Sequence, residues 1–421
     1  MAVPSFLGTS IRREIKTIEM HTSGEPTRIV YAGFPFLTGT LLEQRAAAKA
    51  HHDGVRKSII HEPRGHKDMY GAVLRPHTEH VDSSAAHMGV LFLTHEGYST
   101  MCGHATLAVS RLLVDCCASI DDPSSPLSQE EAIFPQRTAL QFVPSEGTSG
   151  EDIQGDVEVR LHVPCGVVRV VVPAVRTHSG FRADSTRRIR YLSVPSFAAA
   201  TDITVAIPLA LQWPALAAQG RTSVVADVAY GGAFYLFVTA TALGFPASLE
   251  APDLAALDEA TRKVKTAFNA DAQLKQRYLH HPDHADLQFM YSVFVTEPGS
   301  GAAAPGTQGA DTGVCFFADQ QVDRSPTGSG VQARVALAVA KGQRSMGQSW
   351  TYHSLLSRAS EGSRRGFVGT PVEEVAVGER KGVRVEVSGW ANYTGVATWV
   401  VEEDDDLGEG FDFEALGSRS R

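Results

Sequence analysis

The sequence predicts an α/β protein of two domains, in which most of the sheet is antiparallel or mixed. The chain has 421 residues, 43% of them hydrophobic, which is enough for two domains that each bury a core. Runs rich in β-branched and aromatic residues recur along it, with few helical patterns between them. Two stretches, residues 99–113 and 323–340, have the form of one turn-and-helix motif used twice. These three observations set the fold class.

The expected strands are apolar runs bounded mostly by turn residues. They lie at residues 88–97, 157–172, 233–241, 289–297 and 383–401. Parallel neighbours need helical crossovers, and because few helical patterns separate these runs the sheet should be mostly antiparallel or mixed. The helices are expected near residues 41–52, after Cys102, near residues 253–278 and after Thr327.

Four stretches rich in Gly, Ser, Pro and charge are expected to be disordered or mobile surface loops, because such a composition cannot build a core. They lie at residues 121–131, 145–156, 298–311 and 357–366.

The charge balance argues against two classes of partner. The formal net charge is -9, and the 38 basic and 47 acidic side chains form no long block of one sign. This disfavours a surface for nucleic acid or for an anionic membrane. No apolar run reaches the roughly 18 residues of a membrane span, and the amino terminus lacks a signal pattern, so we expect a cytoplasmic protein.

The cysteines form neither a disulfide framework nor a CxxC pair, so reduced thiols are expected. The five are Cys102, Cys116, Cys117, Cys165 and Cys315.

The two turn-and-helix motifs align residue by residue. The aligned pairs are Cys102 with Thr327, Gly103 with Gly328 and His104 with Ser329. A run of small and apolar residues follows in both copies, which predicts a tight turn and then a buried helix. Glycine lets the backbone approach a ligand, and the amides of a first helical turn bind anions such as a carboxylate. Two such helix ends facing each other would hold one carboxylate from both sides.

Cys102 is a candidate base or nucleophile. A thiol at a helix N-terminus has its pKa lowered from the usual value near 8.5, which favours the thiolate at neutral pH. The aligned Thr327 has no comparable acidity, so the two copies of the motif differ in the chemistry they can perform.

Five ordered motifs extend over almost the whole chain. They are IEMHTSGEPTRIV (18–30), HEPRGHKDMYGAVL (61–74), HEGYSTMCGHA (95–105), DVAYGGAFY (227–235) and DRSPTGSG (323–330). In this order and spacing the chain resembles the proline racemase family, which also contains hydroxyproline 2-epimerases and trans-3-hydroxy-L-proline dehydratases.

The resemblance implies a fold of the diaminopimelate-epimerase type. Two pseudo-symmetric domains are each a curled, mostly antiparallel sheet around a central helix, with the substrate in the cleft between them. The first domain is expected over residues 1–197, carries Cys102, and is completed by C-terminal strands within 383–421. The second is expected over residues 198–382 and carries Thr327.

The resemblance also implies the reaction. Racemases of the family use one cysteine from each domain, and here Thr327 stands where the second cysteine would be. Its hydroxyl is too weak an acid and base to exchange a carbon-bound proton at pH 7, so inversion by two bases should fail. In trans-3-hydroxy-L-proline the hydroxyl and the α-hydrogen share one ring face, so Cys102 alone can drive loss of water. We therefore expect a dehydratase that gives 1-pyrroline-2-carboxylate.

Further roles are implied by the resemblance. Asp323 would lie near the ring nitrogen of the imino-acid substrate. Amides or side chains for its carboxylate and amine would come from Gly103, His104, Gly328 and Ser329. Thr327 either hydrogen-bonds the ligand or fills the space of the missing cysteine. The proton for the leaving hydroxide could come from Cys102 itself, from His104 or from Asp323.

Three alternatives stay open. A proline racemase or hydroxyproline 2-epimerase is disfavoured by Thr327, and a non-catalytic imino-acid binder is disfavoured by Cys102 and Asp323. A cysteine hydrolase is disfavoured further, because Cys102 and His104 are two positions apart at a helix start and would not naturally face each other.

No metal or cofactor is expected. His51, His52 and the HHPDH segment (280–284) lack an HExxH pattern or paired cysteines and are interpreted as surface-loop histidines. The sequence contains no GxGxxG fingerprint, P-loop or GxSxG elbow. The oligomeric state stays open, with a homodimer as one candidate.

Overall fold

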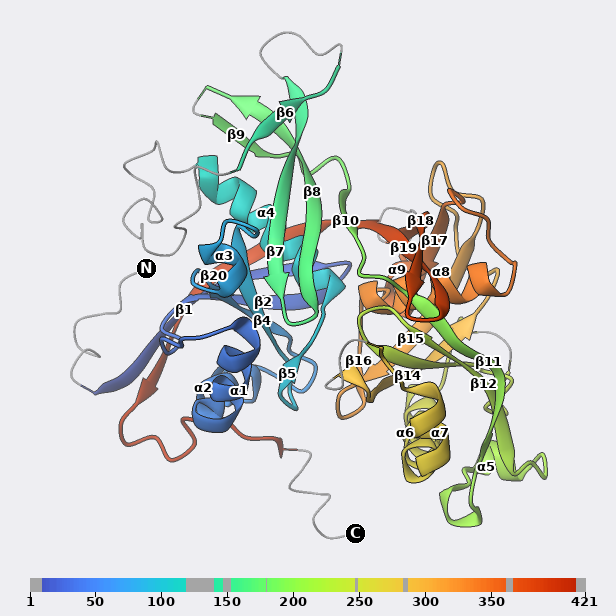
Figure 1. The fold of residues 1–421 in the computed structure, drawn as a ribbon. Helices are drawn as coiled ribbons and strands as arrows, with labels where there is room; N and C mark the ends of the chain where they lie inside the picture. Colours follow the sequence, from blue (N-terminus) through green and yellow to red (C-terminus); the bar gives the residue numbers. More distant parts are fainter. Residues whose placement is uncertain are drawn as a thin grey trace. The chain divides into compact units, whose positions relative to one another are not determined.

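The computed structural model describes residues 10–118, 140–146, 153–178, 180–246, 249–282, 287–360 and 366–413 (Figure 1). Its internal contacts divide the chain into two compact units. Unit 1 consists of Met1–Tyr191 and Trp390–Arg421, and unit 2 consists of Leu192–Gly389. No helix among the described residues is long and apolar enough to cross a membrane.

Unit 1 is built on a mixed sheet that starts from the last strand of the chain. β1 pairs antiparallel with both β20 and β2. From β2 the sheet continues through β3, β4, β7, β8 and β9, and the pairings of β2 with β3 and of β4 with β7 are parallel. The strands are β1 (Ile11–Thr22), β2 (Glu25–Ala32), β3 (Gly71–Arg75), β4 (Met88–Leu93), β5 (Tyr98–Ser99), β6 (Phe142–Pro144), β7 (Gln154–Val163), β8 (Gly166–Thr177), β9 (Gly180–Ala183) and β20 (Ala391–Glu402). β10 (Ile189–Leu192) ends at the first residue of unit 2.

Helix α4 (Gly103–Ala118) is the central helix of unit 1. It packs against β1, β2, β7, β8, β9 and β20. A helix surrounded by a sheet must be apolar or small on all sides, and Ala105, Leu107, Ala108 and Val109 are fully buried. The shorter helices of this unit are α1 (Leu41–His51), α2 (Asp53–Ile60) and α3 (Glu79–Asp82).

Unit 2 repeats this plan. Its sheet runs in the order β11, β12, β13, β14, β15, β17, β18 and β19, and only the pairings of β13 with β14 and of β15 with β17 are parallel within this described run. The strands are β11 (Phe197–Ala206), β12 (Ser223–Tyr230), β13 (Phe234–Thr239), β14 (Met290–Glu297), β15 (Ala310–Phe317), β16 (Gln321–Val322), β17 (Trp350–His353), β18 (Phe367–Val377) and β19 (Arg380–Gly389).

Helix α8 (Gly328–Ala340) is the central helix of unit 2 and packs against β11, β12, β13, β18 and β19. A second core lies under α6 (Leu254–Ala270), where Leu257, Val264 and Phe268 join Trp213. The remaining helices are α5 (Pro214–Ala217), α7 (Ala272–Tyr278), α9 (Leu355–Ala359) and the 3₁₀ helix Leu209–Leu211. The predicted class, a mixed α/β fold with mostly antiparallel strands and helices after Cys102 and Thr327, is confirmed.

Two of the predicted strands are in fact strand pairs. Residues 157–172 cover most of a β7–β8 hairpin, which turns at Pro164 and Cys165. Residues 383–401 include the end of β19 and most of β20, which belong to different units. In both runs the break between the two strands was not predicted, because one or two turn residues barely change the composition of an otherwise apolar and β-branched stretch.

Residues 298–309 are a correction to the expected mobile loops. The amide of Ala304 donates to Thr351 Oγ1 at 2.9 Å, and Thr312 Oγ1 donates to the carbonyl of Ser300 at 3.0 Å. Ala304 is buried and anchors the loop against β15 and β17, while most residues from Gly301 to Gln308 are exposed at the surface, as expected. The segment 121–131 lies outside the described residues, and 145–156 and 357–366 are described only in part.

Candidate active site

Cys102 occupies the position just before the first residue of α4. Its Sγ accepts a hydrogen bond from the backbone amide of Ala105 at 3.3 Å. The sulfur therefore takes the place that a Ser or Asp oxygen holds at an ordinary helix N-cap. Thr106 Oγ1 donates to the carbonyl of Cys102 at 2.7 Å, which fixes the backbone at this point. A negative charge on Sγ would be stabilised by the amide and by the helix dipole.

His104 lies next to this sulfur. Cys102 Sγ is 3.2 Å from His104 Nδ1 and 3.5 Å from Nε2. The imidazole also meets the ring of Tyr70 edge-on, with 4.6 Å between centroids. Burial lowers the pKa of His104 to about 3, so the ring is neutral at physiological pH. The expectation that these two side chains would not face each other is wrong, because Cys102 precedes the helix and helical spacing does not govern its direction.

Thr327 holds the equivalent position before α8 in unit 2, but its side chain is bound differently. It makes no capping hydrogen bond to the helix, and its φ of +62° is uncommon for a β-branched residue. Thr327 Oγ1 instead donates to Asp323 Oδ2 at 2.7 Å, and the Thr327 amide donates to Ser325 Oγ at 3.1 Å. The loop before α8 therefore holds the threonine hydroxyl.

Asp323 is a buried carboxyl group with both oxygens engaged. Oδ1 accepts from the amide of Ser325 at 2.7 Å, and Oδ2 accepts from Thr327. Burial raises the pKa of Asp323 to about 6, and the hydrogen bonds from Thr327 and Ser325 oppose that rise. Asp323 can therefore hold or release a proton near neutral pH.

Ser329 and Gly328 lie in the first turn of α8, where Ser329 Oγ is 2.6 Å from the hydroxyl of Tyr235 on β13. The turn that precedes β13 touches the same helix start. A Cβ atom on Gly231 would lie 2.3 Å from the carbonyl oxygen of Ser329, so only glycine permits this approach. Tyr235 and Gly231 both lie in the motif 227–235, but neither was singled out from the sequence.

Cys315 is a second cysteine close to the Thr327 loop. The amide of Asp323 donates to the carbonyl of Cys315 at 3.1 Å, and Ser292 Oγ is 3.1 Å from Cys315 Sγ. Burial, with the nearby Asp323 charge, raises the pKa of Cys315 well above its ordinary value, so the thiol is neutral at pH 7. This cysteine does not supply the thiolate that Thr327 lacks.

The predicted site residues form two local groups. In unit 1, Cys102, Gly103 and His104 lie together at the start of α4. In unit 2, the start of α8 brings together Thr327, Gly328, Ser329 and Asp323. Tyr70, Tyr235 and Cys315 were missed as neighbours, because only the fold brings them to these helix starts.

The histidines considered as metal ligands do not form a site with each other. The rings of His51 and His52 meet edge-on with centroids 6.5 Å apart, and the 280–284 segment lies partly outside the described residues. Within the described ranges, a different trio of residues has its ligand atoms grouped: Glu79, His80 and His162.

A family model described as proline racemase matches residues 17–123 and 151–412. The chain is 41% identical to the trans-L-3-hydroxyproline dehydratase of Pongo abelii over 402 residues, which cover 94% of each chain. It is also 41% identical to the trans-3-hydroxy-L-proline dehydratase of Homo sapiens, again over 94% of each chain.

The fold matches a crystal structure of a hydroxyproline epimerase from Agrobacterium vitis with bound trans-4-hydroxy-L-proline. The TM-score is 0.69, the sequence identity is 22%, and the match covers 96% of each chain. At this identity the likeness concerns the fold, and it agrees with two units that are each built around one central helix.

Proposed function

The chain belongs to the proline racemase family, and on that premise we propose that it is a trans-3-hydroxy-L-proline dehydratase, a hydro-lyase acting on an imino acid. The observation that carries the proposal is 41% identity over 94% of the chain to proteins with that activity in their names. The pair of Cys102 and Thr327 at the two central helix starts supports it, because one thiol suffices for an elimination and does not suffice for inversion by two bases.

In the proposed reaction the Cys102 thiolate removes the α-proton of trans-3-hydroxy-L-proline. The electron pair of that C–H bond forms a carbon–carbon double bond, and the C–O bond to the 3-hydroxyl breaks. The leaving hydroxide takes up one proton and departs as water. The enamine that remains tautomerises to 1-pyrroline-2-carboxylate. Substrate and products therefore balance without a redox partner.

The surroundings of Cys102 suit this role. The Ala105 amide and the start of α4 stabilise negative charge on the sulfur. His104 is neutral, so it can hydrogen-bond to the sulfur in either protonation state of the thiol without competing as a strong base. We assign Cys102 as the base and His104 as the residue that orients it.

The loop before α8 offers the substrate a hydrogen-bond acceptor. Thr327 Oγ1 donates its proton to Asp323, which leaves its lone pairs to accept a hydrogen bond. Asp323, with a pKa raised to about 6, is protonated in part of the population near neutral pH. We assign Gly103, Gly328 and Ser329 to binding of the carboxylate and amine, Asp323 to the ring nitrogen, and Thr327 to accepting a hydrogen bond from the ligand.

A reduced Cys102 is required throughout this scheme. The cysteines whose side chains are described, Cys102, Cys116, Cys165 and Cys315, are all free thiols. Free thiols persist in a reducing compartment, so we propose that the enzyme works in the cytoplasm.

The test is an NMR time course in deuterated buffer with trans-3-hydroxy-L-proline, run beside L-proline and trans-4-hydroxy-L-proline. We expect 1-pyrroline-2-carboxylate from the first substrate only, and none from the Cys102→Ser variant. Cys116→Ala, which changes another buried thiol of α4, is the matched control and should stay active. Deuterated and inverted proline or 4-hydroxyproline without dehydration would instead identify a racemase or 2-epimerase.

A further inference from the structure

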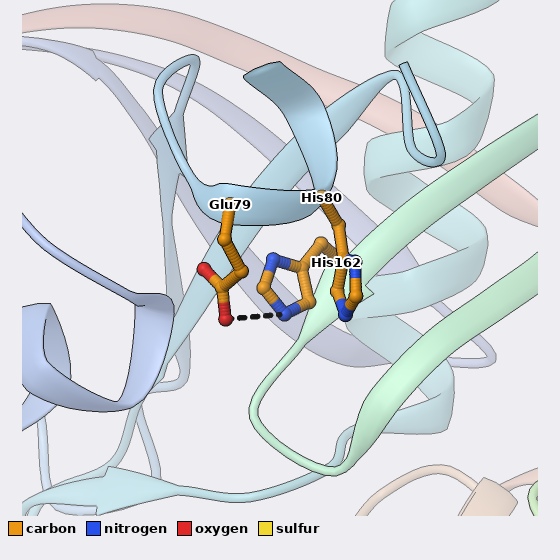
Figure 2. A group of neighbouring side chains, drawn as sticks. All are labelled: Glu79, His80 and His162. Atoms are coloured by element: carbon orange, nitrogen blue, oxygen red, sulfur yellow. Dashed lines mark ion pairs between the residues drawn. The ribbon is translucent and has the colours of Figure 1, made fainter. Parts of the chain in front are cut away.

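Three potential metal ligands meet in unit 1, and none of them belongs to the five motifs used above. Glu79 and His80 are the first two residues of α3, and His162 lies near the end of β7 (Figure 2). One ligand atom from each residue lies within 4.8 Å of the other two. His162 Nε2 is 3.7 Å from Glu79 Oε1, and the two imidazoles meet edge-on with 4.4 Å between centroids.

Two of the three side chains are held in place by a second partner. His162 is buried, and its Nδ1 is 2.9 Å from Thr78 Oγ1. Glu79 Oε2 accepts a hydrogen bond from the amide of Leu41 at 2.9 Å. Histidines and carboxylates that bind metals are oriented in this way, with one polar atom held by the protein and the other presented to the ion. Here the presented atoms are Nε2 of His162 and Oε1 of Glu79.

In the tautomer of His162 that carries its proton on Nδ1, the presented atoms are poorly matched to each other. When His162 donates Nδ1–H to Thr78, its Nε2 carries a lone pair that faces the carboxylate of Glu79. Their separation of 3.7 Å is also too long for a good hydrogen bond. Two electron-rich atoms at this distance, one of them on a buried ring, are stabilised by a cation placed between them.

We propose that Glu79, His80 and His162 bind a divalent transition-metal ion of the zinc class. Two imidazoles and one carboxylate suit Zn²⁺, whereas Mg²⁺ and Ca²⁺ prefer sites made of oxygen alone. Ligands at zinc bond lengths in a tetrahedral arrangement lie about 3.4 Å apart, so the 3.7 Å pair already fits. His80 is only partly buried and can close the remaining gap by rotating its side chain. A water molecule would complete the coordination.

The ion would link segments that are distant in the sequence. It would tie α3 to the end of β7, where His162 pairs with Gly89 of β4. Through the Leu41 amide it would also fix the start of α1. The inference does not rest on the proposed reaction, because none of these residues has a role in it. The sequence gives no motif for the site, since 82 positions separate His80 from His162.

The first experiment titrates chelator-treated protein with Zn²⁺ by calorimetry. We expect the wild type to bind one equivalent, and His80→Gln and Glu79→Gln to bind at least about tenfold more weakly. His77→Gln is the matched control, because His77 is an exposed histidine three residues away that lies outside the trio. It should bind as the wild type does. His80→Gln and Glu79→Gln change side chains that are not fully buried. Both variants and the His77→Gln control should keep full dehydratase activity.

A second experiment identifies the ligands. Co²⁺ in place of Zn²⁺ should give visible bands of a four-coordinate site without a thiolate-to-metal charge-transfer band, since Cys102 and the other thiols are excluded as ligands. Thr78→Val should weaken binding about 10-fold to 100-fold, because it removes both the partner of His162 and the N-cap of α3, and Thr78→Ser should restore it. A thiolate band, no stoichiometric binding, or binding unchanged in both His80→Gln and Glu79→Gln would overturn the proposal.

Discussion

Thr327 Oγ1 donates a 2.7 Å hydrogen bond to the buried carboxylate of Asp323. A hydroxyl has one proton to donate, and Thr327 donates it to Asp323. Toward any other group, Thr327 Oγ1 can therefore only accept hydrogen bonds, through its lone pairs. The residue at the start of α8 is thereby an acceptor backed by a carboxyl group that titrates near neutral pH. The Cys102 sulfur at the start of α4, in contrast, accepts a hydrogen bond from the amide of Ala105.

If Thr327 has the proposed role, Thr327→Val should lower kcat/KM for trans-3-hydroxy-L-proline by about 10-fold to 100-fold, because the variant keeps the β-branch but has no hydroxyl to hydrogen-bond the ligand and Asp323. Thr327→Ser keeps the hydroxyl and should retain most of the activity. Steady-state kinetics on the two purified variants make the comparison. Wild-type kcat/KM in Thr327→Val would mean that the threonine only fills space.

Asp323 should make the protein less stable as the pH rises from about 4 to about 6. Its pKa is raised from 3.8 to about 6 in the folded state, so folding favours the protonated form, and the stability that this contributes is present below pH 3.8 and lost as the pH passes 6. The shift corresponds to about 3 kcal/mol. Urea unfolding of the wild type and of Asp323→Asn across this range measures the difference, and parallel curves would contradict the prediction.

Titration of His104 changes the free energy of unfolding with pH in the opposite direction to that of Asp323. Its pKa is lowered from 6.5 to about 3 by burial, so the neutral ring contributes stability above pH 6.5 that is lost as the pH falls. Over that range the loss approaches about 5 kcal/mol. His104→Gln has no such titration and should lose less stability in acid than the wild type does. Acid unfolding followed by circular dichroism tests this, and an equal or larger acid loss in the variant would refute it.

Gly231→Ala should destabilise the protein by about 1–3 kcal/mol and impair substrate binding. The new methyl group would lie 2.3 Å from the Ser329 carbonyl and 2.6 Å from the amide of Ala333, so the turn before β13 must move away from α8. Gly395→Ala, where nothing lies within 4 Å of the added methyl, is the control. Chemical denaturation and KM are the two readouts, and equal results for both variants would reject the explanation.

The features predicted correctly from the sequence are local ones. The helices after Cys102 and Thr327 follow from a turn and an apolar run within about a dozen residues. Contacts between distant segments could not be predicted in this way. Tyr235 meets Ser329 across 94 positions, and burial at the helix starts, not residue type, sets the pKa of His104 and of Asp323.

Cys102 and His104 show the limit of spacing rules within a single turn. Two positions apart on a helix, side chains diverge, and the expectation followed that rule. One of the two residues lies outside the helix, and its side chain turns back over the first turn. A shift of one residue in the start of the helix therefore decides whether the thiol and the imidazole meet. Sequence patterns locate helix ends only to within about one or two residues.

The pairing of β1 with β20 has a consequence for the order of events during synthesis. β1 and β20 pair along almost their whole lengths, from Ile11 with Glu402 to Thr22 with Ala391. On the ribosome, every residue of unit 2 emerges before β20 does. Unit 2 can therefore fold while the edge of β1 that pairs with β20 is still unpaired. We expect unit 2 to gain protease resistance first in nascent chains stalled where Gly389 has left the ribosome and β20 has not, although unit 1 contains the first residues made. Earlier protection of β1 in such nascent chains would disprove this order.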